Sequence, residues 1–270
     1  MTYSIQDLDD TPWLQLCHAY GRATDTPRHI RALADGKQAA RTAAIAHLSG
    51  TIMHQGTPWT ATAPTALFVA ALLRDPNLQL RPRDRAALVS FVGNVGSVIL
   101  YSPWSIEECE QRAAKTAELP EDPADDEIFW EDVETGDGMY ARALVACARS
   151  ASTLLDAVRP ELDSEEKQVR VQAACAVGRI ASGLILTKGV PRGVIDDIET
   201  LLLDKARSAS STVERCAILL ALREVGAEPR EFVDDESMAV SVCAALAIES
   251  DESATGKLIA ALEDAEHLHC

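Results

Sequence analysis

The segment from His54 to Thr62 (His-Gln-Gly-Thr-Pro-Trp-Thr-Ala-Thr) concentrates polar and aromatic side chains between two expected helices. A histidine there can act as a base or a hydrogen-bond donor, an indole ring can stack against a ligand, and threonine hydroxyls can anchor it. The first helix of the chain must pack nearby, which adds a second histidine and a tyrosine. Together these residues predict a small pocket lined by His18, Tyr20, His54, Gln55, Trp59, Thr60 and Thr62.

A structural interpretation of the same segment stays open. Gly56 can end one helix, and Thr57-Pro58 can start the next segment of chain. The His54 ring would then only hydrogen-bond the backbone of a neighbouring loop. Turns between paired helices lie along one edge of a helical array, so the sequence is compatible with both interpretations.

Residues 118–137 form an acidic insert that contains two prolines and one short aromatic stretch, Ile128-Phe129-Trp130. Aromatic side chains provide the buried anchors of many protein interfaces, and carboxylates speed the encounter with a basic partner. The predicted partner-binding residues are Asp125, Asp126, Glu127, Phe129, Trp130, Glu131 and Asp132. In the alternative interpretation, the aromatic side chains dock on the protein's own helices and the acids solvate a loop.

Sequence motifs for catalysis or metal binding are missing from the chain. It lacks GxSxG, HExxH, a P-loop and GxGxxG, and none of its cysteines has an obvious histidine partner. The final residues, His267-Leu-His269-Cys270, are of ligand type but adjacent, whereas a structural zinc site needs four spaced ligands. We therefore predict no catalytic residue, no metal site and no cofactor.

The distribution of charge limits the classes of partner. The net charge of the 270-residue chain is −17, but residues 1–100 carry +2 and residues 107–137 carry −11. A general nucleic-acid or anionic-membrane binder would show a basic face, so the expected partner is a protein with a basic surface. The one basic cluster, Arg81, Arg83 and Arg85, is either a solvated loop or an internal mate for the acidic insert.

Cysteine usage and the absence of a long apolar run indicate the compartment. The seven cysteines form no CxxC pair, and Cys147, Cys175, Cys216 and Cys243 lie in Ala/Val/Leu-rich stretches where free cysteine acts as a small core residue. No apolar run approaches the roughly 18 residues of a membrane span, and the start of the chain is acidic. A reducing cytoplasm is the expected location.

The apolar period is helical almost throughout. Tyr140, Leu144, Cys147, Ala151 and Leu154, for example, recur at the three- and four-residue spacing of a helix face. Alternation with a period of two is missing over any useful length. Proline after a hydroxyl residue marks many helix starts, and glycine marks helix ends. The sequence predicts an all-α fold of about twelve helices with short connections.

Four Ala-rich helices begin alike and recur at a regular interval. They start at Arg41, Arg85, Arg170 and Glu214, which are 44, 85 and 44 residues apart, and another amphipathic helix precedes each one. Paired helices repeating at about 44 residues resemble the HEAT-repeat superfamily. The aspartate that HEAT units place at the turn within the pair appears as Asp35, six residues before Arg41.

This resemblance implies a right-handed α-solenoid of about five helix pairs, with the chain forming one domain over residues 1–270. Its expected parts are an N-terminal capping helix (1–24), N-terminal repeats (25–117), the acidic insert as a loop (118–137) and C-terminal repeats (138–270). His18-Ala-Tyr-Gly and His54-Gln-Gly-Thr also resemble segments of an uncharacterised group of bacterial HEAT-repeat proteins. The resemblance implies a family, without an activity.

Three functions fit these observations. The first is a noncatalytic scaffold or regulator that binds a partner protein through its repeat surface and acidic insert, for example to neutralise a basic toxin. The second is a HEAT-like DNA glycosylase for alkylated bases, with Trp59, Trp104 and Trp130 as its aromatic set. The net charge opposes it, because phosphate contacts need a positive surface. The third is a small-molecule or cofactor-handling protein of the phycobilin-lyase type, which requires a pocket.

Overall fold

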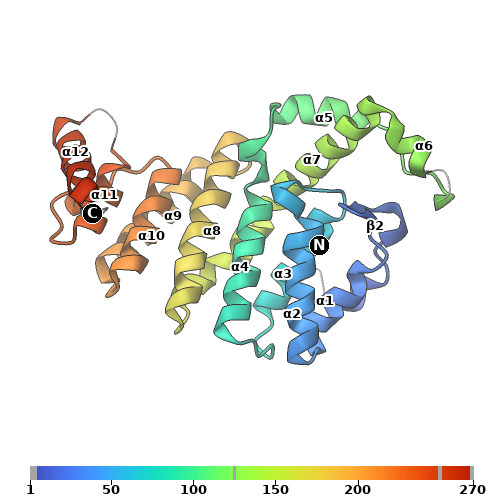
Figure 1. The fold of residues 1–270 in the computed structure, drawn as a ribbon, viewed down its shortest axis with the longest axis horizontal. Helices are drawn as coiled ribbons and strands as arrows, with labels where there is room; N and C mark the ends of the chain where they lie inside the picture. Colours follow the sequence, from blue (N-terminus) through green and yellow to red (C-terminus); the bar gives the residue numbers. More distant parts are fainter. Residues whose placement is uncertain (1–4, 124–125, 249–250, 268–270) are drawn as a thin grey trace.

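The computed structural model describes residues 5–123, 126–248 and 251–267, with the side chains of 5–6, 128–129 and 263–267 outside the description. The prediction of an all-helical fold is confirmed for these residues (Figure 1). The α-helices are α1 (Thr26–Asp35), α2 (Gln38–His47), α3 (Thr62–Arg74), α4 (Pro82–Gly96), α5 (Ile106–Lys115), α6 (Asp126–Glu131), α7 (Val133–Val158), α8 (Lys167–Leu186), α9 (Arg192–Ser208), α10 (Thr212–Glu224), α11 (Met238–Ala245) and α12 (Glu252–His267).

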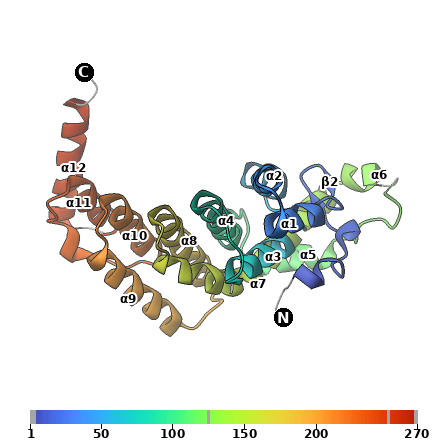
Figure 2. The same ribbon diagram turned by 90° about the horizontal axis from the view of Figure 1, so that it is seen from below.

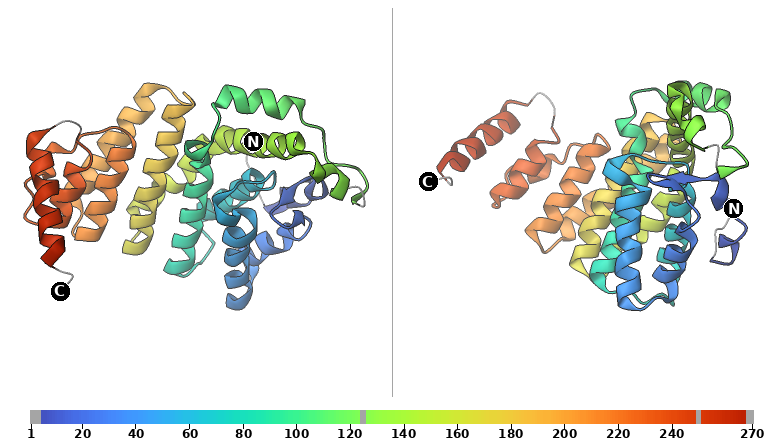
Figure 3. Two further views of the ribbon diagram at one scale, coloured as in Figure 1. Left: turned by 45° about the horizontal axis from the view of Figure 1, so that its top comes forward. Right: turned by 45° about the vertical axis from the view of Figure 1, so that its right-hand side comes forward.

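The helices form an elongated row that ends at α12 on one side (Figure 1). Helices α2, α4, α8 and α10 lie side by side in chain order, and α3, α7 and α9 pack behind them (Figure 2). Helix α5 lies along α7, and α6, which precedes α7 in the chain, lies at one end of the molecule (Figure 3). At the other end, α10 contacts α11, and α11 contacts α12. Each helix therefore buries its apolar face mainly against neighbours in the row.

Small residues let the central helices approach closely. A Cβ atom on Gly93 of α4 would lie 2.6 Å from the Ala176 Cβ of α8, and one on Gly178 of α8 would lie 2.7 Å from Ala221 of α10. Among the described residues, α8 is the one helix long and apolar enough to cross a membrane, and 56% of its most apolar window is buried inside the protein. It packs between α4 and α10, as a central core helix does.

The N-terminal segment differs from the capping helix expected over residues 1–24. Two short 3₁₀ turns, Ile5–Leu8 and Trp13–Gln15, lead into a hairpin of β1 (Cys17–His18) and β2 (Gly21–Arg22). Gly21 has a φ of +114°, which closes the tight turn and which residues other than glycine rarely adopt. Pro12 and this glycine interrupt any helix in the segment.

The acidic insert also differs from the loop expected over residues 118–137. Its residues 126–131 form α6, and α7 begins at Val133, well before the apolar period becomes regular. The Asp132 carboxylate accepts hydrogen bonds from the Thr135 backbone N–H and hydroxyl at 2.8 and 2.7 Å, which caps the first turn of α7. Two predicted partner-binding groups, Asp125 and the Phe129 side chain, lie outside the described residues.

Candidate functional site

The hairpin turn at residues 18–21 and the segment at residues 51–57 meet at the N-terminal end of the helix row. The backbone N–H of Ala19, in the hairpin turn, donates to the Thr51 carbonyl at 3.2 Å. The Tyr20 hydroxyl lies 3.3 Å from Nδ1 of His54, which itself donates to the Gly50 carbonyl at 3.0 Å. His18, Tyr20 and His54 were expected in one region, and the structure brings them together.

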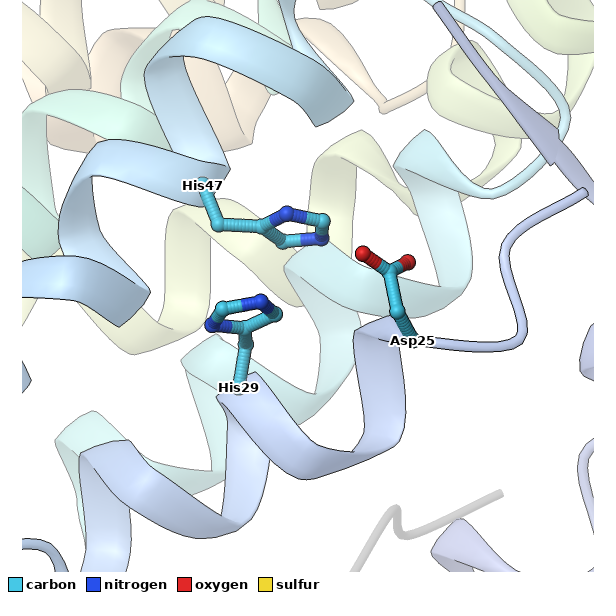
Figure 4. Close-up of side chains that lie close together, drawn as sticks. All are labelled: Asp25, His29 and His47. Carbon is cyan, nitrogen blue, oxygen red and sulfur yellow. The ribbon is translucent and has the colours of Figure 1, made fainter. Parts of the chain in front are cut away.

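A cluster of three histidines and one aspartate lies beside this junction; we call His18, Asp25, His29 and His47 the histidine cluster. The His29 and His47 rings stack, with centroids 4.1 Å apart and an angle of 12° between their planes. The Asp25 carboxylate lies next to the pair (Figure 4). The ligand-type atoms of Asp25, His29 and His47 all lie within 4.8 Å of one another.

The members of the cluster come from α1 and the residue before it, from α2 and from β1. Asp25 directly precedes α1, and His29 lies one turn later on the same side of that helix. His47 is the last residue of α2, which packs against α1. His18 comes from β1. An ionised carboxylate can only accept hydrogen bonds, so His18 Nε2–H donates to Asp25 at 2.9 Å. The other ring nitrogen, His18 Nδ1, accepts a hydrogen bond from the Tyr20 backbone N–H at 3.2 Å.

Burial keeps the stacked rings neutral. Burial lowers the pKa of His47 from 6.5 to about 4, and the neighbouring His29 adds to this effect. Burial also lowers the pKa of His29, with a further contribution from Arg28. For Asp25, burial alone would raise the pKa, but the His18 hydrogen bond and the surrounding histidines hold it below its ordinary value. The cluster thus pairs two neutral imidazoles with one carboxylate near pH 7.

Sequence reasoning missed Asp25, His29 and His47. One local sign was present: Asp25 and His29 are four residues apart at a helix start, which places them on one face. His47 lies 18 residues further along on another helix. Only the packing of α1 against α2 brings its ring onto His29, so no local pattern contains this contact.

The remaining residues of the predicted pocket lie in separate places. Trp59 and Thr60 line a cavity of about 200 Å³ whose other walls include Trp130 and Met139. The Thr62 hydroxyl is buried, donates to the Ile52 carbonyl and accepts from the backbone N–H of Trp59, both at 2.8 Å. It therefore has a structural role. Gln55 lines a larger groove between α2, α4 and α8, with a volume of about 590 Å³.

The acidic insert docks on the N-terminal hairpin through a buried ion pair. Arg22 donates from Nε and from a second nitrogen to the two carboxylate oxygens of Asp126, at 2.8 and 2.5 Å. The Arg22 guanidinium also donates to the Leu14 and Pro120 carbonyls at 3.0 and 2.8 Å, and its side chain is only 6% exposed. These contacts hold α6 firmly against β2.

The basic cluster of Arg81, Arg83 and Arg85 was open to two interpretations, a solvated loop or an internal mate for the insert, and two of its arginines have other partners. Arg81 pairs with Asp84 within its own helix, and Arg85 pairs with Glu161 after α7. Both arginines are therefore paired away from the insert, so these contacts do not support the interpretation of the cluster as its internal mate. Arg22, which lies in the tight hairpin that sequence analysis expected to be helical, takes that role.

The described side chains of the insert fall into two groups, one that packs on the protein and one that faces solvent. Trp130 packs edge-to-face on Trp59, with centroids 6.4 Å apart, and contacts a small apolar cluster of Cys17, Leu119 and Met139. Glu127, Glu131 and Asp132 are exposed. Trp130 and Asp126 therefore face the protein, whereas the other described carboxylates of α6 and its junction with α7 face solvent.

Comparisons with family models, curated proteins and solved structures found no match to this chain.

Proposed function

We propose that this protein is a noncatalytic scaffold with a HEAT-like solenoid fold, which holds a basic protein partner against its acidic insert. The observation that carries this proposal is the anchoring of α6. Arg22 and Asp126 fix the helix from within, and Glu127 and Glu131 remain exposed on one side, four residues apart. A rigid acidic surface loses little conformational entropy on binding, which favours recognition of a complementary basic surface.

Repeated arginine contacts support the HEAT-like arrangement. Near the start of α2, α4, α8 and α10, an arginine donates to a carbonyl at the end of the preceding helical segment and to a second group further along the chain. The first and second acceptors are Ala34 and Gln79 for Arg41, Leu73 and Glu161 for Arg85, Ser164 and Glu214 for Arg170, and Ala206 and Asp235 for Arg215. The same contact recurring at each helix pair favours a repeated unit, and we propose a right-handed solenoid of about five such pairs.

The groove between α2, α4 and α8 offers a second contact surface on the same molecule. It has a volume of about 590 Å³ and is lined by apolar side chains such as Phe91 together with polar ones such as Asn94. Tyr101 lies at this groove and is 75% exposed. An exposed tyrosine beside a mixed groove is typical of protein interfaces, so the proposed partner contacts this groove as well as the insert.

The two alternative functions have less support in the geometry. Trp104 packs on Tyr140 and on the Arg112 guanidinium, 4.2 Å from its ring, so it is engaged within the chain. A glycosylase would need a free aromatic side chain in a basic groove. For small-molecule binding, the cavity beside Trp59 is apolar, and the buried indole N–H of Trp59 has no hydrogen-bond partner among the described residues. Its volume of about 200 Å³ is below that of ordinary ligand pockets.

A capture experiment with matched charge reversals tests the scaffold proposal. The full chain is immobilised, in buffer with EDTA, and exposed to native cell lysate beside two variants. One is Glu127→Lys with Glu131→Lys on α6. The control is Asp197→Lys with Glu224→Lys, which reverses two exposed acids elsewhere on the helix row. We expect a basic protein to be captured by the intact chain and the control, and at least tenfold less by the α6 variant.

Two results would contradict the proposal. One is equal loss of the captured protein from both variants, since the effect would then come from net charge alone. The other is recovery of nucleic acid in place of protein.

If a protein is captured, titration calorimetry with the purified partner measures its dissociation constant for the intact chain and for each variant.

A further inference from the structure

The histidine cluster brings together a donor set that proteins use for transition metals. Asp25, His29 and His47 offer one carboxylate oxygen and two imidazole nitrogens, all within 4.8 Å of one another. Two histidines and one carboxylate, from the start of α1 and the end of α2, suit a divalent first-row metal ion. We propose that Asp25, His29 and His47 form a binding site for such an ion, with Zn²⁺ as the probe.

Coordination requires a ring rotation as well as a shorter separation, because an ion lies in the plane of each ligating imidazole and the His29 and His47 rings are stacked within 12° of parallel. Metal–ligand bonds of about 2.0–2.2 Å place the ligand atoms of a tetrahedral ion roughly 3.4 Å apart. Separations of up to 4.8 Å in the cluster must therefore shrink by as much as about 1.4 Å, which rotations of two side chains can share. The His47 ring is 7% exposed and its Nε2 lies 3.2 Å from the Thr26 hydroxyl, whereas Asp25 and His29 are half-buried and can move.

The surroundings of the three side chains fit a metal site. His18 donates to Asp25 Oδ1 and orients the carboxylate, as partners of ligating groups commonly do. The half-buried Asp25 and His29 leave an approach from solvent.

One nearby cation competes with the proposed ion. Arg28 is 72% exposed, and one of its nitrogens lies 3.8 Å from Asp25 Oδ2. Its positive charge repels a divalent ion at the same carboxylate. Removing this charge by Arg28→Gln is therefore expected to tighten metal binding several-fold. Because Arg28 lies on the surface, this substitution leaves the fold intact.

Zn²⁺ titration of the metal-free full chain tests the site. We expect one ion per chain with a dissociation constant in the micromolar range or below, weakened at least tenfold by His29→Gln or Asp25→Asn. The matched control is His54→Gln, a histidine outside the cluster. A second control replaces His267, His269 and Cys270 in the C-terminal tail. Circular dichroism and metal-free thermal unfolding verify that each variant is folded.

Cobalt(II) provides a readout that separates this site from the cysteines. Co²⁺ bound by nitrogen and oxygen ligands gives visible d–d absorption without a thiolate charge-transfer band. The proposal is overturned by a dissociation constant above about 1 mM, by binding that survives His29→Gln unchanged, or by loss of binding only in the tail variant. Tighter binding by Arg28→Gln supports the site even where a ligand substitution unfolds the chain, and unchanged binding by that variant counts against it. None of these results depends on the partner proposed for the acidic insert.

Discussion

Arg170 joins three parts of the chain through one guanidinium group. It donates to both carboxylate oxygens of Glu214 in α10, at 2.6 and 2.8 Å, and to the Ser164 and Glu165 carbonyls before α8, both at 2.9 Å. Glu214 is only 9% exposed, and its hydrogen bond from Arg170 lowers its pKa. Bidentate contacts of this kind fix orientation as well as distance.

Replacing Glu214 by glutamine should destabilise the protein in a pH-dependent way. We expect a loss of about 1–2 kcal/mol in the free energy of unfolding at pH 7, because a charged hydrogen-bond acceptor is removed from a half-buried pair. The folded pKa of Glu214 lies below its ordinary 4.5. Its contribution is therefore complete above pH 4.5 and is lost as the pH falls through the folded pKa.

Urea unfolding at pH 7 and pH 4 measures this effect. The difference between wild type and Glu214→Gln should be larger at pH 7. The control is Glu224→Gln, an exposed substitution in the same helix, which should change stability by less than about 0.5 kcal/mol. An equal loss for Glu214→Gln at both pH values would show that the charge of the carboxylate contributes nothing.

Helix α6 shows how tertiary contacts create an element. A six-residue helix is too short to be stable on its own in water. The ion pair between Arg22 and Asp126, together with the packing of Trp130 on Trp59, supplies the missing stabilisation. The chain thus converts part of a proline-containing acidic stretch into an ordered surface.

The reactivity of Cys17 should report whether α6 is docked. Cys17 is 1% exposed and belongs to the apolar cluster against which Trp130 packs, and burial, aided by Asp126, raises its pKa to about 11. Trp130→Ala should uncover this thiol and increase its alkylation rate at pH 8 at least tenfold. Mass spectrometry of iodoacetamide-labelled peptides measures the rate at each cysteine.

Two controls separate local undocking from general unfolding. Cys147 is fully buried, and burial raises its pKa to about 12, so it should stay unlabelled in every folded variant. Glu127→Gln changes the exposed side of α6 and should leave Cys17 protected. If Trp130→Ala labels Cys17 no faster than wild type, Trp130 does not hold the insert in place.

At the scale of the whole molecule, stability depends on continuous contact along the helix row. Helices α4, α8 and α10 approach through Gly93 against Ala176 and Gly178 against Ala221. Each close contact allows larger apolar side chains on either side to interdigitate. A change at one contact therefore affects two neighbouring helices at once.

Gly178→Ala should destabilise the chain, whereas the same substitution at Gly193 should not. An added Cβ at Gly178 would meet Ala221 backbone and side-chain atoms at 2.7 Å, which forces α8 and α10 apart. We expect a loss of about 1–3 kcal/mol. Gly193, in α9, has open space around it, and alanine there should gain about 0.5–1 kcal/mol. Chemical denaturation compares the two, and equal changes would mean that α8 and α10 do not pack this closely.

The sequence by itself determined most of the helices and their pairing in order along the chain. Apolar spacing, proline after hydroxyl residues and glycine at helix ends are local features, and they identified α1 to α4 and α7 to α10 because a helix is formed by contacts within four residues. The recurring arginine contact was visible only in part: the fourth Ala-rich helix was aligned on Glu214, although Arg215 makes the contact that resembles that of Arg170.

Only the tertiary structure decided which residues that are distant in the sequence contact one another. The ring of His47 stacks on His29 because α1 and α2 pack, and Arg22 reaches Asp126 across more than one hundred residues. The N-terminal hairpin and α6 depend on such distant partners, so local patterns predicted the wrong element at both places. Contacts between remote residues leave no fixed spacing in one sequence, and the candidate metal site and the anchored acidic surface consist of such contacts.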